Sequence, residues 1–145
     1  MRSKLLQDHA GARTFALIFE TGDEAMTGLS AFAREHNLAA ARFSAIGAFR
    51  EATLGYFDWD AKDYQRIPVN EQVEVLSLIG DVALDEKGEP TVHAHVVVGR
   101  FDGSTRGGHL LGGVVRPTLE VILEESPAHL KKQHDPESGL ALIAL

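Results

Sequence analysis

Three histidines lie close together in the segment VHAHVVVGRFDGSTRGGHLLGG, which spans residues 92–113 and is otherwise rich in valine and glycine. Imidazole nitrogens bind zinc at about 2.0–2.1 Å, and three histidines plus water form a common catalytic zinc site. Such a site supplies a Lewis acid and an activated water. His93, His95 and His109 are therefore candidate metal ligands. The alternative is that they are polar side chains on the solvent face of a hairpin.

His93 and His95 are separated by one residue in a segment that is typical of a β-strand. Side chains alternate in direction along a strand, so both imidazoles point to one face, about 6.6 Å apart along the chain. The sequence contains no cysteine, which excludes thiolate ligands and disulfides. Any metal must then be held by histidine, carboxylate, backbone or water.

His109 joins this pair only in certain hairpin registers. In antiparallel pairing, opposed residues share a face, and a slip of one residue moves a side chain to the other face. Registers that place His109 opposite His95 or opposite Val97 put all three histidines on one face. The metal hypothesis therefore makes a specific prediction about this hairpin.

The turn of the hairpin decides between the registers. A two-residue turn at 102–103 would direct His109 to the wrong face. The metal site requires either a loop centred on one residue or a bulge at 107–108. The two glycines at 107–108 make a bulge plausible.

One helix is predicted, over about residues 22–37. Thr21 and Glu24 fit a capping box, in which a hydroxyl and a carboxylate bind the first free amides of the helix. Asn37 is suited to a left-handed end. His36 near that end is expected to be structural, because a cation there favours the helix dipole. The apolar stripe that predicts the helix consists of Ala25, Leu29, Phe32, Ala33 and His36.

The rest of the chain is predicted to be strands joined by short turns, which favours antiparallel pairing. Gly47 and Gly80 inside strand patterns indicate bulges or close approach of the backbone. The expected fold class is α+β, a single domain over residues 1–145 with a mainly antiparallel sheet and one principal helix. The expected strands are 13–19, 39–48, 51–59, 64–68, 72–83, 90–100, 105–115, 117–125 and 139–145.

Several segments resemble the plants-and-prokaryotes conserved (PPC) domain family. They are TGDEAMTGLSAFAREHNL, SAIGAF and QVEVLSLIGDVALDEKGEPTVHAHVVVGRFDGSTRGGHLLGGVVRPTLEVILEE. The resemblance covers about residues 13–145, and the H-x-H strand followed by GGH is its most specific part. The sequence therefore looks like a bacterial stand-alone member of this family.

The resemblance implies a compact α+β domain, assembly as a homotrimer, and binding of a metal, most simply zinc, by the residues matching His93, His95 and His109. It also implies a fold similar to that of acetolactate decarboxylase, an enzyme with a three-histidine zinc site. In plants the domain is joined to AT-hooks in nuclear DNA-binding proteins, and bacterial stand-alone members are usually called DNA-binding proteins.

The sequence departs from the plant proteins in one respect. An AT-hook needs an Arg-Gly-Arg-Pro core to enter the minor groove, and no such string occurs; VVRPT at 114–118 lies in a strand pattern without flanking basic residues. We therefore expect the chain alone to bind DNA weakly. Any action at DNA would require a DNA-associated protein partner.

The charge of the chain also argues against strong DNA binding. Fourteen Lys and Arg against 21 Asp and Glu give a net charge of −7, and the basic residues are scattered. Nucleic-acid-binding proteins usually show a clustered basic patch. The adjacent pair Lys131-Lys132 is expected to lie on a solvated loop, flanked by surface histidines His129 and His134. A local patch would need the fold to gather scattered arginines such as Arg42, Arg50 and Arg66.

No membrane segment is predicted. No apolar run approaches the about 18 residues of a membrane span. The apolar stretch 15–19 is too short for the core of a signal peptide. The expected location is the cytoplasm.

Two classes of function remain open from the sequence. The first is a trimeric, metal-binding regulatory or DNA-associated protein. The second is a small zinc-dependent enzyme, lyase-like or hydrolytic, in which the metal meets a small anionic or carbonyl ligand. No residue is assigned a catalytic role, because charged candidates of this kind are mostly surface ions. The candidates that could lie near the metal are Glu74, Arg100, Asp102, Arg106, Arg116 and Glu120.

The aromatic residues of LGYFDWD form a further cluster. Tyr56, Phe57 and Trp59 are expected to pack at a strand edge or in a subunit contact, since aromatic side chains are enriched in cores and interfaces.

Overall fold

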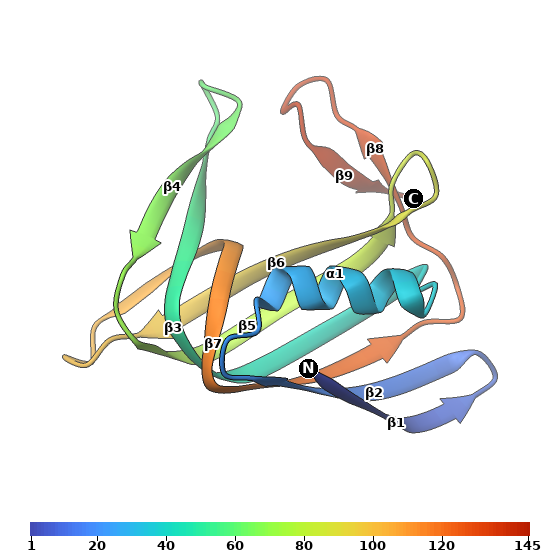
Figure 1. The fold of residues 1–145 in the computed structure, drawn as a ribbon. Coiled ribbons are helices and arrows are strands. Elements are labelled where there is room, and N and C mark those ends of the chain that lie inside the picture. Colours follow the sequence, from blue (N-terminus) through green and yellow to red (C-terminus); the bar gives the residue numbers. More distant parts are fainter.

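Nine strands pair into one sheet, and a single helix packs on it (Figure 1). The protein is described by a computed structural model that covers all residues 1–145. Every strand pairing is antiparallel except the short contact between β5 and β8. The elements are β1 Arg2–His9, β2 Ala12–Glu20, α1 Ala25–Glu35, β3 Ala40–Asp58, β4 Asp63–Val69, β5 Val73–Leu84, β6 Pro90–Gly99, β7 Thr105–Glu125, β8 Lys131–His134 and β9 Ala141–Ala144.

The centre of the sheet closes on itself. The strand order is β1-β2-β7-β3-β5-β8-β9, and β6 pairs with both β5 and β7. Strands β3, β5, β6 and β7 therefore form a closed cycle of hydrogen-bonded neighbours, to which β4 adds at the edge of β3. The predicted α+β class, a mainly antiparallel sheet with one helix, is confirmed.

Two strands are longer than the sequence indicated. The predicted strands 39–48 and 51–59 are one strand, β3, and 105–115 and 117–125 are one strand, β7. Both long strands carry register shifts, so they bend without ending. One shift lies at Gly47, where a side chain would overlap the backbone of Thr118. The predicted bulge at Gly47 is confirmed.

Gly80 on β5 permits a close approach, as its strand context indicated. A Cβ atom at this position would overlap the carbonyl oxygen of His93 and the ring of Phe43. The absence of a side chain thus lets β5 and β6 meet just beside the first histidine of the H-x-H pair.

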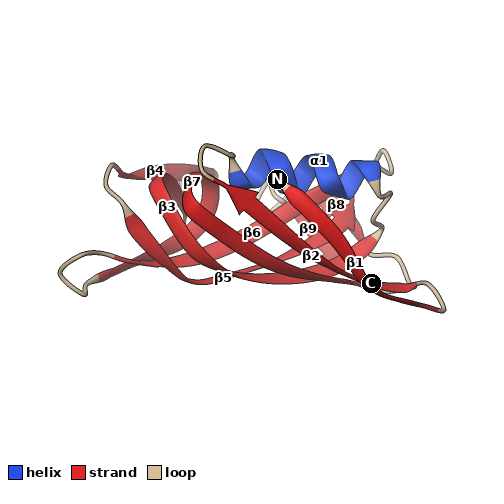
Figure 2. Ribbon diagram, turned by 60° about the horizontal axis from the view of Figure 1, so that its bottom comes forward, coloured by secondary structure: helices blue, strands red, loops and turns tan.

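Helix α1 covers one face of the sheet (Figure 2). Its predicted apolar stripe is buried as expected, with Ala25, Leu29, Phe32 and Ala33 in the core. Asn37 has a φ of 52°, which confirms the left-handed helix end.

The predicted start of the helix is wrong. The N-cap residue is Glu24, whose carboxylate accepts hydrogen bonds from the backbone amides of Met26 and Thr27. Thr21 instead donates its hydroxyl hydrogen to the carbonyl oxygen of Pro117. The reason is tertiary, because Glu24 also accepts from the amide of Gly113 and is thereby fixed against β7.

His36 follows the helix and is structural, as predicted. Its ring centroid lies 4.1 Å from that of Phe32 and 5.1 Å from that of Phe15. These contacts place it against the core and away from the other histidines.

Two strands were not predicted from the sequence. β1 is exposed at every position, so it has no alternating burial pattern, and it pairs only with β2. β8 contains Lys131-Lys132, and the expectation of a solvated loop is wrong for Lys132, whose side chain is only 9% exposed. His129 and His134 are exposed, as expected.

The only helix, α1, has 11 residues, which is fewer than a helix needs to cross a bilayer.

Candidate metal centre

The β6–β7 hairpin adopts a register that places the three histidines on one face. His95 pairs directly with His109, and the regular pairing continues to Gly99 opposite Thr105. The loop is therefore centred on Asp102, and no bulge is needed at 107–108. Gly103, with a φ of 80°, closes the loop through a hydrogen bond from its amide to the carbonyl of Arg100.

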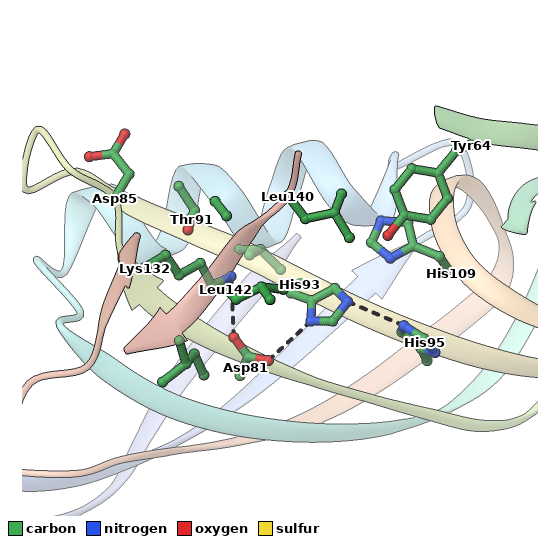
Figure 3. Close-up of a pocket in the computed structure, with 13 residues that line it drawn as sticks. Tyr64, Asp81, Asp85, Thr91, His93, His95, His109, Lys132, Leu140 and Leu142 are labelled. Carbon is green, nitrogen blue, oxygen red and sulfur yellow. Dashed lines mark hydrogen bonds and ion pairs between the residues drawn. The ribbon is translucent and has the colours of Figure 1, made fainter. Parts of the chain in front are cut away.

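The three imidazoles converge (Figure 3). Ring centroids are 5.0 Å apart for His93 and His95, 5.0 Å for His93 and His109, and 5.5 Å for His95 and His109. One nitrogen from each ring can be chosen so that all three lie within 4.8 Å of one another. The structure thus brings together the residues that the sequence singled out.

The spacing of the nitrogens suits a tetrahedral ion. Nε2 of His93 and Nε2 of His95 are 3.2 Å apart. Two nitrogens bound tetrahedrally to zinc at ordinary bond lengths are about 3.3 Å apart. His109 Nδ1 is buried without a hydrogen-bond partner in the chain. A divalent cation therefore fits the donor set, since imidazole nitrogens are suitable ligands for zinc and similar ions.

Burial favours the neutral form of two of the three imidazoles, those of His95 and His109. It lowers the pKa of His109 to about 4, helped by electrostatic interaction with His93, His95 and Lys132. Burial also lowers the pKa of His95, as does the proximity of His93. Neutral rings have a free lone pair near pH 7, which is the form that binds a metal.

Asp81 supports the first histidine from the neighbouring strand. It lies opposite His93 in the β5–β6 pairing, with its Oδ2 3.3 Å from His93 Nδ1. Burial alone would raise the pKa of Asp81, but the hydrogen bond with His93 and the positive charge of Lys132 lower it overall. The carboxylate thus directs His93 Nε2 toward the other rings, as carboxylates commonly do for metal-bound histidines.

Asp81 is not among the candidate residues that the sequence indicated. The signal that could have found it is a lone acid within the apolar strand segment LSLIGDVAL. A carboxylate at a partly buried strand position needs a partner, and here the partners are His93 and Lys132.

Tyr64 on β4 covers the third histidine. Its ring stacks on that of His109, with centroids 4.6 Å apart and planes inclined by 29°. Burial raises the pKa of the Tyr64 hydroxyl, so the phenol remains neutral. Tyr64 also packs edge-on against Phe57 at 5.4 Å, which links this ring to the aromatic cluster of the β3–β4 hairpin.

A cleft of about 620 Å³ opens beside the histidines. The β8–β9 hairpin and the residues leading into it supply much of its apolar wall. Lys132 and Asp81 lie on its polar side, and Tyr64 borders it next to His109 (Figure 3). Its apolar lining residues are Val92, Leu140, Ala141, Leu142 and Ile143.

The other charged candidates do not line this cleft. Arg100 pairs with Glu71 and lies near Asp102 in the hairpin loop. Arg106 donates to the carbonyl of Pro68, and Arg116 to the side chain of Gln72. Glu74 and Glu120 are exposed elsewhere on the sheet. The expectation that these are mostly surface ions holds.

The remaining aromatic residues are at the hairpin tip. Tyr56 and Trp59 are exposed, and Lys62 lies over the Trp59 ring at 3.6 Å. Only Phe57 of this cluster is connected to the histidines, through Tyr64.

A β-rich domain with three converging imidazoles beside an open cleft defines a class of candidate metal-binding proteins. The chain matches the model of the Plants and Prokaryotes Conserved (PCC) domain over residues 7–127, and it belongs to this family. The resemblance seen in the sequence is thereby confirmed.

Solved structures from three organisms share the fold. A plant- and prokaryote-conserved protein of Pyrococcus horikoshii is 32% identical, with a TM-score of 0.85 over 99% of this chain and 95% of that one. A metal-containing protein of Archaeoglobus fulgidus is 34% identical, with a TM-score of 0.83 over 91% and 93%. A Ralstonia eutropha protein described as a "putative DNA-binding protein" is 30% identical, with a TM-score of 0.84 over 90% of each chain.

Two further similarities are more limited, one in sequence identity and the other in the share of the related protein that is matched. A Staphylococcus aureus protein described as similar to alpha-acetolactate decarboxylase is 12% identical, with a TM-score of 0.52 over 77% of this chain and 51% of that one, which shows a shared fold alone. The bifunctional protein GlmU of Synechococcus sp. (strain JA-3-3Ab) is 33% identical over 130 residues. That match includes 88% of this chain but only 20% of the length of GlmU.

Proposed function

We propose that this protein binds one divalent metal ion, most simply zinc, through His93, His95 and His109. The observation that carries the proposal is the convergence of three imidazoles beside a cleft. The similarity to a protein described as metal-containing supports it. When bound, such an ion supplies a Lewis acid at the side of the cleft.

The chain's own residues prepare this site. Asp81 holds the Nδ1 side of His93, so that its Nε2 is free for the metal. Tyr64 limits the movement of the His109 ring and shields it from water. The short β6–β7 loop fixes the pairing of His95 with His109.

Elemental analysis of protein purified without a histidine tag tests the metal site. We expect about one metal ion per chain under the three-ligand arrangement. His95→Ala should lose the metal, whereas His129→Ala, at an exposed histidine outside the cluster, should keep it. Unchanged metal content in His95→Ala would contradict the proposal.

The proposed assembly is a homotrimer, which the sequence resemblance implies. Apolar side chains are exposed on the face of the sheet opposite α1, and contiguous exposed apolar surface commonly marks an interface. This face adjoins the site, because Ile79 pairs with His95 across β5 and β6. Its exposed members are Ile46, Leu76, Ile79, Val97 and Ile122.

The proposed biological role is regulatory, with DNA contact made together with a partner that carries a basic element. The similarity to a protein described as DNA-binding supports a link to DNA. The arginines do not favour direct binding, since Arg42 pairs with Glu124 and Arg50 with Glu51. A cytoplasmic location remains a prediction from the sequence.

The cleft favours a second candidate function, a small metal-dependent enzyme or a sensor of a small molecule. A purely structural metal site is closed, whereas catalytic sites keep an open position. Here the three histidines border about 620 Å³ of open space. We assign no reaction and no catalytic residue.

A further inference from the structure

The side chain of Lys132 is mostly buried in the wall of the cleft, and its ammonium group forms an ion pair. Its side chain is 9% exposed, and its nearest ionic partner, Asp81 Oδ1, is 3.4 Å from Nζ. That separation exceeds the usual range of a good hydrogen bond, and Asp81 Oδ1 has no hydrogen-bond partner. An ammonium group carries three donors, and the ion pair with Asp81 engages at most one of them, so the others can meet a ligand in the cleft.

The backbone holds Lys132 in this position. β8 pairs with β9 on one side, and Lys131 contacts Leu84 of β5 on the other. Side chains alternate along a strand, so Lys131 points to solvent while Lys132 points inward. Figure 3 shows the Lys132 side chain reaching toward Asp81, on the same side of the cleft as His93.

The cleft thus has two polar groups that can meet a ligand, the three-histidine cluster and the Lys132 ammonium group. They lie on the same side of the cleft, and Asp81 contacts both Lys132 and His93. Leu140 and Leu142 of the hairpin region, together with Val92 of β6, line the space beside them. An apolar body with an oxygen-bearing group at each end matches this arrangement.

The charges of the cleft favour an anion. Asp81 is already engaged by His93 and Lys132. Asp85, the other acid at the cleft, accepts hydrogen bonds from the amides of Lys87 and Glu89 in its own turn. A bound divalent cation together with Lys132 outweighs these two carboxylates.

We propose that the cleft binds a short aliphatic acid, with one carboxylate held by Lys132 and a second oxygen-bearing group at the three-histidine site. A carboxylate suits the site better than a phosphoryl group, since the lining contains no arginine and no helix N-terminus. The inference deepens the proposed metal-binding function and rests on it.

Calorimetric titration of metal-loaded protein with malonate, succinate, glutarate and adipate tests the inference. We expect one chain length to bind best, because the distance between the Lys132 ammonium group and the three-histidine site is fixed by the fold. Butyrate, which lacks the second carboxylate, should bind at least about tenfold more weakly, as for the loss of a hydrogen bond to a charged group. This comparison uses the unaltered protein and needs no variant.

Two variants locate the contact. Lys132→Met should weaken binding of the best dicarboxylate about tenfold or more, and Lys132→Gln, which keeps a polar group, should also weaken it. Lys131→Met makes the same charge change at the exposed neighbouring position and should leave binding unchanged. Equal losses in Lys131→Met and Lys132→Met would overturn the inference.

Metal content measured on the same samples separates the two proposals. If each chain holds about one metal ion and no dicarboxylate binds, the ligand class is wrong and the metal-binding function stands. If the chain holds no metal, the metal-binding function is wrong and the inference falls with it.

Discussion

Asp81 on β5 lies opposite His93 on β6, and its Oδ2 is 3.3 Å from the Nδ1 of that histidine. The contact fixes which nitrogen of His93 faces His95. A metal-binding histidine held in this way loses metal affinity when its partner is removed, commonly by about 10–100-fold.

We therefore expect Asp81→Asn to weaken metal binding by about 10–100-fold while the three histidines remain in place. Competition with a chelator measures the change. Glu74→Gln is the matched control, since it removes an exposed carboxylate from the same strand. Equal affinity in Asp81→Asn and the unaltered protein would show that Asp81 does not position the ligand.

The stability of the metal-free protein should depend on pH through His109. The pKa of this residue is about 4 in the folded chain, against about 6.5 for an unperturbed histidine. The unfolded chain therefore binds the proton first as the pH falls, which favours unfolding. The stabilisation is complete above about pH 6.5 and is lost progressively as the pH falls to about 4.

Urea unfolding of chelator-treated protein at several pH values between these limits checks this prediction. His109→Gln should show a smaller loss of unfolding free energy over the same range. His129→Ala, which changes an exposed histidine, should behave like the unaltered protein. The prediction is wrong if His109→Gln retains the full pH dependence.

Assembly should depend on the exposed apolar face of the sheet. Light scattering is expected to give three times the 15.7 kDa chain mass. Ile79→Lys should yield monomers, because Ile79 is 59% exposed in the single chain and a lysine there would bury an unpaired charge in the interface. Leu145→Lys, at the chain end, should leave the mass unchanged. A concentration-independent monomer for the unaltered protein would refute the trimer.

Binding to duplex DNA by the isolated protein should be weak. A net charge of −7 per chain opposes approach to the phosphate backbone, and Arg42 and Arg50 are paired with acids. We expect dissociation constants no tighter than about 10⁻⁴–10⁻⁶ M at physiological salt. A salt titration with a mixed pool of duplexes measures this. Sub-micromolar, sequence-selective binding at about 0.15 M salt would make the chain a direct DNA-binding protein.

Local patterns in the sequence were sufficient for much of the fold. The apolar stripe of Leu29, Phe32 and Ala33 predicts α1, and the alternating pattern around His93 and His95 predicts β6. Both patterns show which side chains lie on the buried face of the element. The turn residues then mark most strand ends. The same reasoning showed that His109 joins the other two histidines only in certain registers of the β6–β7 hairpin. The observed loop, centred on Asp102, gives one of those registers.

Other features depend on partners that are distant in the sequence. Glu24 replaces Thr21 as the helix cap because β7 supplies the amide of Gly113. β1 carries no burial pattern and exists only through its pairing with β2. Hydrogen bonds of this kind join residues that are far apart in the sequence, so no local sequence pattern predicts them.

The sequence alone was sufficient to identify the three histidines as candidate metal ligands and to predict the two strands that carry them. The tertiary structure decided what surrounds them: Asp81 behind His93, Tyr64 over His109, and Lys132 turned into the cleft. Lys132 illustrates the difference most clearly. A lysine in a short polar segment is expected in solvent, and it becomes buried here because β8 docks beside β5 and one face of a strand must point inward.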